Sequence, residues 1–402
     1  MSRKTISIIT FHYTPENSGA GQRLEAMAKT LSASFKVQVF ALSSRIHSRG
    51  DYFVKVDENL TIHYVSAYLP SNTFSFFKSL IGWWYSLKLI RRANEVNADL
   101  ALIALPVIYL FAFISALCNA KKKMIDLNSH NTVMEAPGLF GKKIRKNFLK
   151  RLHHLLNKFD LVTVSNEDEQ RWLEKDVKIP LPRIQIVHDG IGIEKFKTLS
   201  ACKYLNGNVK FSISYIGSVN HRIQFETIID AVRGMDDVTL NIIGDGDDLK
   251  RLKQYVDQNN IYNVNLPGWL PWIKARPYYQ TSDLLFASRK KEIDTLIPSK
   301  LYEYLATGLP ILYQGGGSAS QFLRRFNNTF VTSGNDVRAF EKLIWRIKRL
   351  APRRSPENVQ NIKNNFIREK LCIRFAESAA RLLNEPKHSG VYVEDILQSA
   401  EH

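Results

Sequence analysis

A serine, a lysine and a glutamate lie close together in the stretch 297–311 of this 402-residue sequence. The carboxylate of Glu303 has the lone pairs to accept two hydrogen bonds from a ribose diol. Ser299 and Lys300 bring hydrogen-bond donors and positive charge to the start of a predicted helix, where a diphosphate is favoured. These residue types suit a nucleotide. The alternative is a solvent-exposed Glu303 that pairs with Lys300 at helical spacing.

The surrounding residues predict the short helix that positions this carboxylate. Pro298 suits the first turn of a helix, Gly308 suits its C-terminal cap, and Pro310 prevents continuation. Residues at i, i+3 and i+4 form the buried face: Leu301, Tyr304 and Leu305. Glu303 projects away from that face and is therefore available to a ligand.

A second region of interest follows the first predicted strand, residues 6–11. The polar, glycine-containing loop 14–21 leads into a helical pattern whose apolar face comprises Leu24, Met27, Ala28 and Leu31. A loop between a strand and a helix has the size to hold a phosphate. An ordinary turn is the alternative.

Strands and helices alternate through both halves of the chain. The first half has apolar strands at 36–42, 61–65, 99–105, 123–127, 159–165 and 184–187. The pattern restarts with strands at 210–216 and 238–243 and helices at 225–232 and 249–258. Such alternation requires parallel sheets, so the sequence predicts an α/β fold with two Rossmann-like domains and a cleft between them.

One apolar run, residues 100–117, has about the length that crosses a bilayer. Pro106 divides it, and a strand, a turn and a helix at 108–118 explain it as one buried βαβ step. Because a buried parallel strand is itself continuously apolar, we favour the buried interpretation over a transmembrane helix.

Composition narrows the classes of protein further. The net charge of +18 draws a protein towards phosphates on nucleic acid, anionic lipid or a ligand. No zinc finger, RNP-like motif or basic heptad region is visible, so nucleic acid is the weaker partner. Cys118, Cys202 and Cys372 are far apart and indicate neither disulfides nor a metal site, which fits a reducing cytoplasm. Residues 1–13 lack the features of a signal peptide.

The pattern from Ser299 to Pro310 resembles the donor-site helix of a known family. Ser-Lys-Leu-x-Glu-Tyr-x-Ala-x-Gly-x-Pro is similar to that of retaining glycosyltransferases of the GT-B fold, in family four, particularly its bacterial polysaccharide and lipopolysaccharide branch. The resemblance implies that Glu303 binds the ribose of a nucleotide-sugar donor. The family has a second glutamate eight residues earlier, where this chain has Thr295. By resemblance, Thr295 and the backbone after it meet the donor instead.

The N-terminal loop is similar to the loop of the same family. In residues 13–23, the resemblance implies that Gly19 and Gly21 let backbone amides approach the donor phosphates or the transferred sugar. Glu16, in the same loop, is a predicted catalytic residue.

Two further catalytic predictions follow the strand at 123–127. Asp126 and His130 resemble the segment that supplies a polar group beneath the anomeric carbon. Both lie at the C-terminal end of a predicted parallel strand, where ligands of α/β proteins bind. An ordinary surface or core histidine is the alternative for His130.

The second half resembles the family in pattern and departs from it in charge. Asp189 stands in place of the family's asparagine in the turn between domains, and Ser218 replaces an arginine that holds the diphosphate. His221 and Arg222 are therefore predicted as substitutes. Gly244 ends a strand at a turn where the family's backbone approaches the base.

A basic and aromatic stretch, residues 74–92, is the best membrane-binding segment. Its aromatic and cationic residues suit the headgroup region, and further lysines and arginines occur at 121–123 and 142–151. In the resembled family this part of the chain often docks on anionic bilayers. The alternative is an ordinary amphipathic helix that packs its tryptophans inward.

Taken together, the resemblance implies a GT-B protein with an acceptor domain at 1–192, a donor domain at 193–365, a helix at 366–384 that returns to the first domain, and a tail at 385–402. The expected reaction moves a sugar with retention from a UDP- or GDP-sugar to a glycan or lipid-linked acceptor, at the cytoplasmic face of the cell membrane. No metal ion, other cofactor or nucleic acid is expected. A nucleotide-sugar 2-epimerase of the same fold, a non-catalytic binder and a basic nucleic-acid-binding protein are the alternatives.

Overall fold

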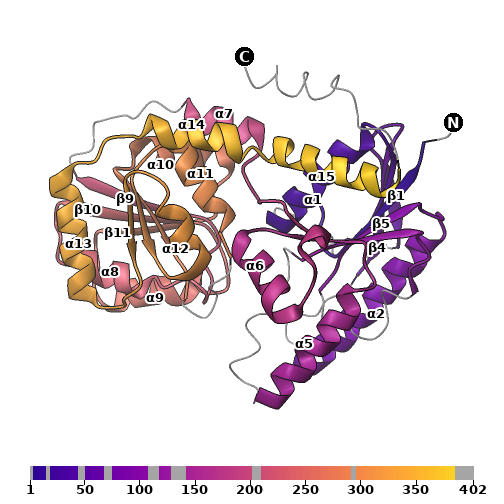
Figure 1. Ribbon diagram of the computed structural model, residues 1–402. Helices are drawn as coiled ribbons and strands as arrows, with labels where there is room; N and C mark the ends of the chain where they lie inside the picture. The colour runs from indigo at the N-terminus through magenta and orange to yellow at the C-terminus, as the bar shows by residue number, and fades with distance from the viewer. Residues whose placement is uncertain are drawn as a thin grey trace. The chain divides into compact units, whose positions relative to one another are not determined.

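The computed structural model describes residues 3–14, 19–43, 50–67, 75–106, 117–127, 142–201, 210–290 and 296–384. The contacts divide the chain into two compact units, residues 1–189 with 368–402, and residues 190–367. Each unit has its own sheet (Figure 1). We call them unit 1 and unit 2.

The sheet of unit 1 is parallel except at one edge, where β3 pairs antiparallel with β4. In spatial order its strands are β3 (Tyr52–Lys55), β4 (Leu60–Ser66), β2 (Lys36–Ser43), β1 (Thr5–Thr10), β5 (Leu100–Ala104), β6 (Lys122–Asp126), β7 (Leu161–Val164) and β8 (Ile184–Ile186). Every residue of β5 is buried, as expected of a strand covered on both faces. The register aligns Ile6 of β1 with Val37 of β2 and with Leu100 of β5.

Helices cover both faces of this sheet, and alternate residues of a strand enter different cores. Ile8 belongs to a core with α1 (Gly19–Ser32) and α15 (Arg368–Leu382), whereas Ile9 belongs to a core with α2 (Ser75–Asn94) and α5 (Lys142–Leu156). The predicted apolar face of α1 is buried. The final helix α15, yellow in Figure 1, packs against α1 and so completes unit 1. The shorter elements are α6 (Glu167–Trp172), η3 (Leu173–Val177) and η4 (Leu181–Arg183).

The sheet of unit 2 is parallel throughout. Its spatial order is β11 (Val264–Gly268), β10 (Val238–Ile243), β9 (Phe211–Ile216), β12 (Leu284–Ser288), β13 (Ile311–Gln314) and β14 (Thr329–Thr332). Numbered within the unit, this is the order 3-2-1-4-5-6 of dinucleotide-binding folds, with a topological switch point between β9 and β12.

Two cores also cover the sheet of unit 2. Phe286 enters the core that contains α8 (Glu226–Val232), α9 (Leu249–Gln258) and α13 (Val337–Leu350). Leu285 enters the other, which contains α7 (Ile193–Ser200), α10 (Trp272–Thr281), α11 (Ser299–Thr307), α12 (Gly317–Leu323) and α14 (Pro356–Asn365). The predicted α/β class with two Rossmann-like sheets is confirmed.

The apolar run at 100–117 begins as strand β5, so the buried interpretation holds for its first part, and residues 107–116 lie outside the described ones. Among the helices that the structure describes, none has the length and apolarity needed to cross a membrane.

Candidate functional site

The switch point of unit 2 brings a lysine against a glycine. The ammonium of Lys300, in the first turn of α11, donates a hydrogen bond to the hydroxyl of Tyr215 and lies 3.7 Å from the centre of that ring. Gly217, directly after β9, lies so close that a Cβ there would be 2.6 Å from the Lys300 nitrogen. Glycine at this position therefore makes room for the lysine. Positive charge sits at the carboxyl end of β9, where α/β sheets bind ligands.

Burial lowers the pKa of Lys300 to about 7, because the ammonium is withdrawn from water. The charge of Glu303 opposes this shift, and that of Arg289 adds to it. Near neutral pH the amine therefore changes charge, and a bound anion would favour the protonated form.

Glu303 lies one helical turn further along α11 and contacts two side chains in the described part of the chain. Its Oε1 atom is 2.6 Å from the ammonium of Lys195 on α7, and its Oε2 atom accepts a hydrogen bond from the Tyr279 hydroxyl at 3.0 Å. The ion pair with Lys300, which was the alternative interpretation, is replaced by the pair with Lys195. The Glu303 carboxylate is therefore partly exposed and is held by two donors.

The predicted helix is confirmed. It spans Ser299–Thr307, and Gly308 caps it with φ 72°, in the left-handed region that favours glycine. The residues predicted for its inner face, Leu301, Tyr304 and Leu305, are fully buried. Pro298 is the N-cap residue, and its side chain makes no capping hydrogen bond. The first turn of an α-helix has backbone amides without an intrahelical partner, and that of Ser299 is one of these donors.

Gly244 and Arg222 lie at the same edge of unit 2. A Cβ on Gly244, which has φ 150°, would fall on the carbonyl oxygen of Gly217, so the contact between these two loops already requires glycine. Arg222 is exposed, and within the described residues its guanidinium has no hydrogen bond or ion pair. His221 pairs with Asp247 at 3.2 Å in an exposed position. The structure brings Arg222 to this edge without fixing its direction.

In unit 1, Asp126 forms a buried ion pair at the carboxyl end of β6. Its two oxygens lie 3.0 and 3.1 Å from the guanidinium of Arg23 on α1, and Thr163 donates to Oδ1 at 2.7 Å. Arg23 also donates to the Val187 carbonyl. With 3% exposure and both oxygens engaged, Asp126 supports Arg23 in this structure, and its catalytic role stays a prediction.

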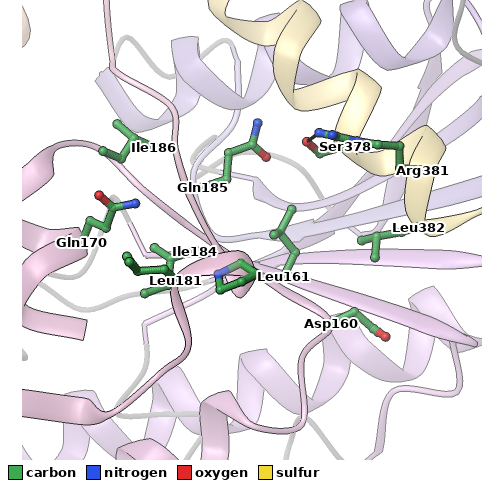
Figure 2. A pocket seen from close by; sticks show the side chains of 11 residues that line it. Asp160, Leu161, Gln170, Leu181, Ile184, Gln185, Ile186, Ser378, Arg381 and Leu382 are labelled. Carbon is green, nitrogen blue, oxygen red and sulfur yellow. Dashed lines mark hydrogen bonds between the residues drawn. The ribbon is translucent and has the colours of Figure 1, made fainter. Parts of the chain in front are cut away.

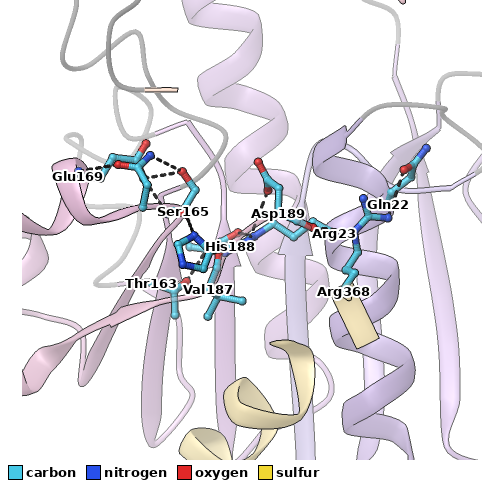
Figure 3. Close-up of polar contacts among 11 residues, drawn as sticks. Gln22, Arg23, Thr163, Ser165, Glu169, Val187, His188, Asp189 and Arg368 are labelled. Carbon is cyan, nitrogen blue, oxygen red and sulfur yellow. Dashed lines mark hydrogen bonds and ion pairs between the residues drawn. The ribbon is translucent and has the colours of Figure 1, made fainter. Parts of the chain in front are cut away.

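A second buried carboxyl group lies beside this pair. Glu169 accepts hydrogen bonds from the backbone amide and the hydroxyl of Ser165, at 2.7 and 2.9 Å (Figure 3). Burial raises the pKa of Glu169 to about 7, although these hydrogen bonds oppose the shift. His188 bonds to the Ser165 carbonyl through Nδ1 at 2.9 Å, and burial lowers the pKa of this imidazole.

Of the other predicted residues, Gly19 and Gly21 form the first turn of α1. Glu16, His130 and Thr295 lie outside the described residues. Sequence reasoning missed Lys195, Tyr279 and Glu169. Lys195 meets a partner 108 positions away, and no local pattern marks such a contact.

A cavity in unit 1 is lined by other residues than these. It opens at the amino end of β7 and beside β8, and its lining comprises Asp160, Leu161, Gln170, Leu181, Pro182, Ile184, Gln185, Ile186, Ser378, Arg381 and Leu382 (Figure 2). Asp126 lies at the opposite, carboxyl edge of the same sheet. The cavity contains none of the predicted site residues.

Two family models match the chain. Residues 17–195 match the model described as Glycosyltransferase Family 4, and residues 203–365 match Glycosyl transferases group 1. No curated protein matches the chain.

Solved structures share the fold at low sequence identity. Sucrose-phosphate synthase from Thermosynechococcus elongatus has a TM-score of 0.76 at 14% identity, over 95% of this chain and 100% of that one. HepE from Anabaena, solved with UDP and glucose, has a TM-score of 0.65 at 15% identity, over 94% and 99%. WaaG, a glycosyltransferase involved in lipopolysaccharide biosynthesis, has a TM-score of 0.63 at 13% identity, over 93% and 99%.

The two sheets, the switch-point site and these matches define the class. The chain is a glycosyltransferase of the GT-B fold.

Proposed function

We propose that this glycosyltransferase moves a sugar, with retention at the anomeric carbon, from a UDP- or GDP-sugar to a glycan or lipid-linked acceptor in cell-surface polysaccharide biosynthesis. The acceptor hydroxyl oxygen bonds to the anomeric carbon while the bond from that carbon to the nucleoside diphosphate breaks, and the hydroxyl proton leaves with the diphosphate. Metal-independent transfer, the family-four assignment and the lipopolysaccharide branch are parts of the same proposal.

The observation that carries the proposal is the arrangement on α11. Lys300, at the N-terminus of the helix, lies against Gly217 at the end of β9, and Glu303 follows one turn later. A diphosphate is stabilised by a helix N-terminus and an adjacent cation, and a carboxylate one turn away suits the ribose. HepE, which shares the fold, was solved with UDP-glucose, which supports a nucleotide sugar as the donor.

The membrane part of the proposal rests on α2 and α5. Leu80, Trp83 and Trp84 of α2 are 47%, 36% and 54% exposed, while Tyr85 and Leu89 on its other face are buried. The interpretation that both tryptophans pack inward is therefore wrong. Helix α5 packs on the same core and exposes Lys146, Lys150 and Arg151. Exposed tryptophans beside basic side chains suit the headgroup region of an anionic bilayer. This supports a place at the inner face of the cell membrane.

Glu303→Ala tests the donor site. We expect UDP or GDP to raise the melting temperature of the wild type and to bind at least about tenfold more weakly to the variant, because hydrogen bonds to a charged group are lost. Thermal shift and calorimetric titration measure this, and NMR of the transfer product reports its anomeric configuration.

Glu341→Ala, an exposed residue of α13, is the control. Unchanged nucleotide binding by Glu303→Ala, or no nucleotide binding by the wild type, would contradict the proposal. A product with inverted anomeric configuration would contradict only the retaining mechanism. Transfer that stops in EDTA would contradict only metal independence.

A further inference from the structure

The carboxylate of Glu303 receives one protein donor on each oxygen. Lys195 is 2.6 Å from Oε1, and Tyr279 donates to Oε2 at 3.0 Å. An ionised carboxylate has about four acceptor positions, two on each oxygen. Counting contacts with the residues that the structure describes, one position on each oxygen therefore stays open.

Tyr279 is held rigidly. It is 2% exposed, and its ring lies 6.1 Å from that of Tyr304 and 5.9 Å from that of Trp272, measured between centroids. Because the ring is enclosed by other side chains, its hydroxyl has a fixed direction. The hydroxyl then sets the rotation of the Glu303 carboxylate.

Lys195 is held from two sides. The next residue on α7, Phe196, is buried in the same core as Leu301 of α11, which fixes the helix relative to Glu303. The Lys195 ammonium also lies 5.0 Å from the centre of the Trp272 ring, in the range of a cation–π contact. The cation is thus placed beside the carboxylate by packing as well as by charge.

The side chains of Glu303 and Lys195 both reach the surface in part. The side chain of Glu303 is 17% exposed and that of Lys195 is 35% exposed, so part of the carboxylate reaches the surface beside the lysine. A partly buried charge needs hydrogen bonds. Lys195 and Tyr279, both in unit 2, occupy two of the four acceptor positions of the Glu303 carboxylate. A cis-diol has two hydroxyl donors, which equals the number still needed.

We propose that Lys195 and Tyr279 are positioning residues that orient Glu303 so that one open acceptor position on each oxygen meets one hydroxyl of the donor ribose. The inference rests on the proposed function, since it assumes that a nucleotide binds at Glu303. It goes beyond it by assigning two residues on α7 and α10 to the selection of ribose over deoxyribose.

The test measures the preference for the diol itself. UDP and GDP, and the 2′,3′-dideoxy form of each, are titrated by calorimetry into wild type, Lys195→Met and Tyr279→Phe. We expect the wild type to prefer the ribonucleotide by about tenfold or more. Each variant should reduce that preference to about threefold or less while it binds the dideoxynucleotide as the wild type does.

Matched controls lie on the same helices. Lys197→Met removes a lysine of α7 that pairs with Glu194 at 3.8 Å, and Tyr278→Phe removes the hydroxyl next to Tyr279 in sequence. Neither should change the preference. Lys195→Arg, which keeps a cation, should restore part of the preference lost in Lys195→Met.

The outcomes separate the two proposals. If the wild type binds no nucleotide, the proposed function and this inference both fail. If the wild type prefers the ribonucleotide and the variants keep or increase that preference, the donor site stands and the positioning role is overturned. Equal weakening of both nucleotides by the variants would show a structural role only and would also overturn it.

Discussion

At the scale of single residues, two buried carboxyl groups of unit 1 have different kinds of partner. Asp126 faces the permanent charge of Arg23, whereas Glu169 accepts its two hydrogen bonds from the uncharged groups of Ser165. A cation compensates a buried carboxylate far better than neutral donors do. Burial therefore raises the pKa of Glu169 to about 7.

This pKa predicts a pH dependence of stability. The folded protein holds the Glu169 proton more tightly than the unfolded chain does, since the pKa rises from 4.5 to about 7. The free energy of unfolding should therefore fall as the pH rises from about 4.5 through about 7, and this contribution should level off above that. Glu169→Gln, which stays neutral, should gain up to about 3 kcal/mol relative to the wild type between pH 5 and pH 8.

Urea denaturation at several pH values measures that difference. Glu58→Gln, an exposed residue of the same unit, is the control and should follow the wild type. A constant difference between Glu169→Gln and the wild type from pH 5 to pH 8 would show that Glu169 does not titrate in this range.

Residue types alone predicted which side of α11 carries Glu303, because helical periodicity separates it from Leu301, Tyr304 and Leu305. They did not predict its partner. The spacing favoured Lys300, but packing directs that ammonium to Tyr215 and brings Lys195 to Glu303.

At the scale of elements, α2 has one face in the core and one at the surface. Tyr85, Leu89, Ile90 and Ala93 are buried, whereas Trp83 and Trp84, which come directly before Tyr85 on the same helix, are exposed. An exposed tryptophan pair costs solubility unless it meets an apolar partner.

We therefore expect vesicles that contain anionic lipid to carry the protein to the top of a density gradient. Trp83→Ser with Trp84→Ser should reduce the floated fraction severalfold, because the indole rings supply the apolar contact with the interface. Trp345→Ser, an exposed tryptophan of α13 in unit 2, is the control.

Flotation that is unchanged by the double substitution would contradict docking through α2. A gel shift with oligonucleotides, run beside the flotation, distinguishes lipid from nucleic acid as the partner of the basic surface. Nucleic-acid binding would show a steep salt dependence set by the number of phosphate contacts.

At the scale of the whole molecule, each hydrophobic core stays within one unit. Both cores of unit 2 are built from residues between Ile191 and Ile367. One core of unit 1 combines residues from the beginning of the chain with Cys372, Phe375 and Ala379 of α15. Unit 1 is therefore closed by a helix that comes after all of unit 2 in sequence.

Separate cores predict separate responses to core substitutions. Phe375→Ala should destabilise unit 1 by about 3 to 5 kcal/mol, and Phe340→Ala should do the same to unit 2, because each removes a buried ring. Each substitution should lower the unfolding temperature of its own unit by about 10 °C. Hydrogen exchange followed by peptide analysis assigns the loss of protection to a unit. Equal loss in both units for either variant would contradict independent cores.

The sequence by itself determined the α/β class, most strands of unit 1 and the first strands of unit 2. These elements have strong local signals: continuous apolar runs such as β5, and glycines at strand ends such as Gly217 and Gly244. It did not reveal β3, a four-residue strand at the edge of the sheet whose last three residues are exposed and which pairs with β4.

The tertiary structure decided what each polar group does. The Arg23–Asp126 pair and the two donors on Glu303 depend on contacts between residues distant in sequence. Glu169 meets Ser165 only four positions away, but its raised pKa comes from burial in the folded chain. Charge state and hydrogen bonding follow from burial and from the nearest opposite charge. Both quantities exist only once the sheets and helices have packed, so the chemistry of Glu303 was suggested by its sequence and shaped by Lys195 and Tyr279.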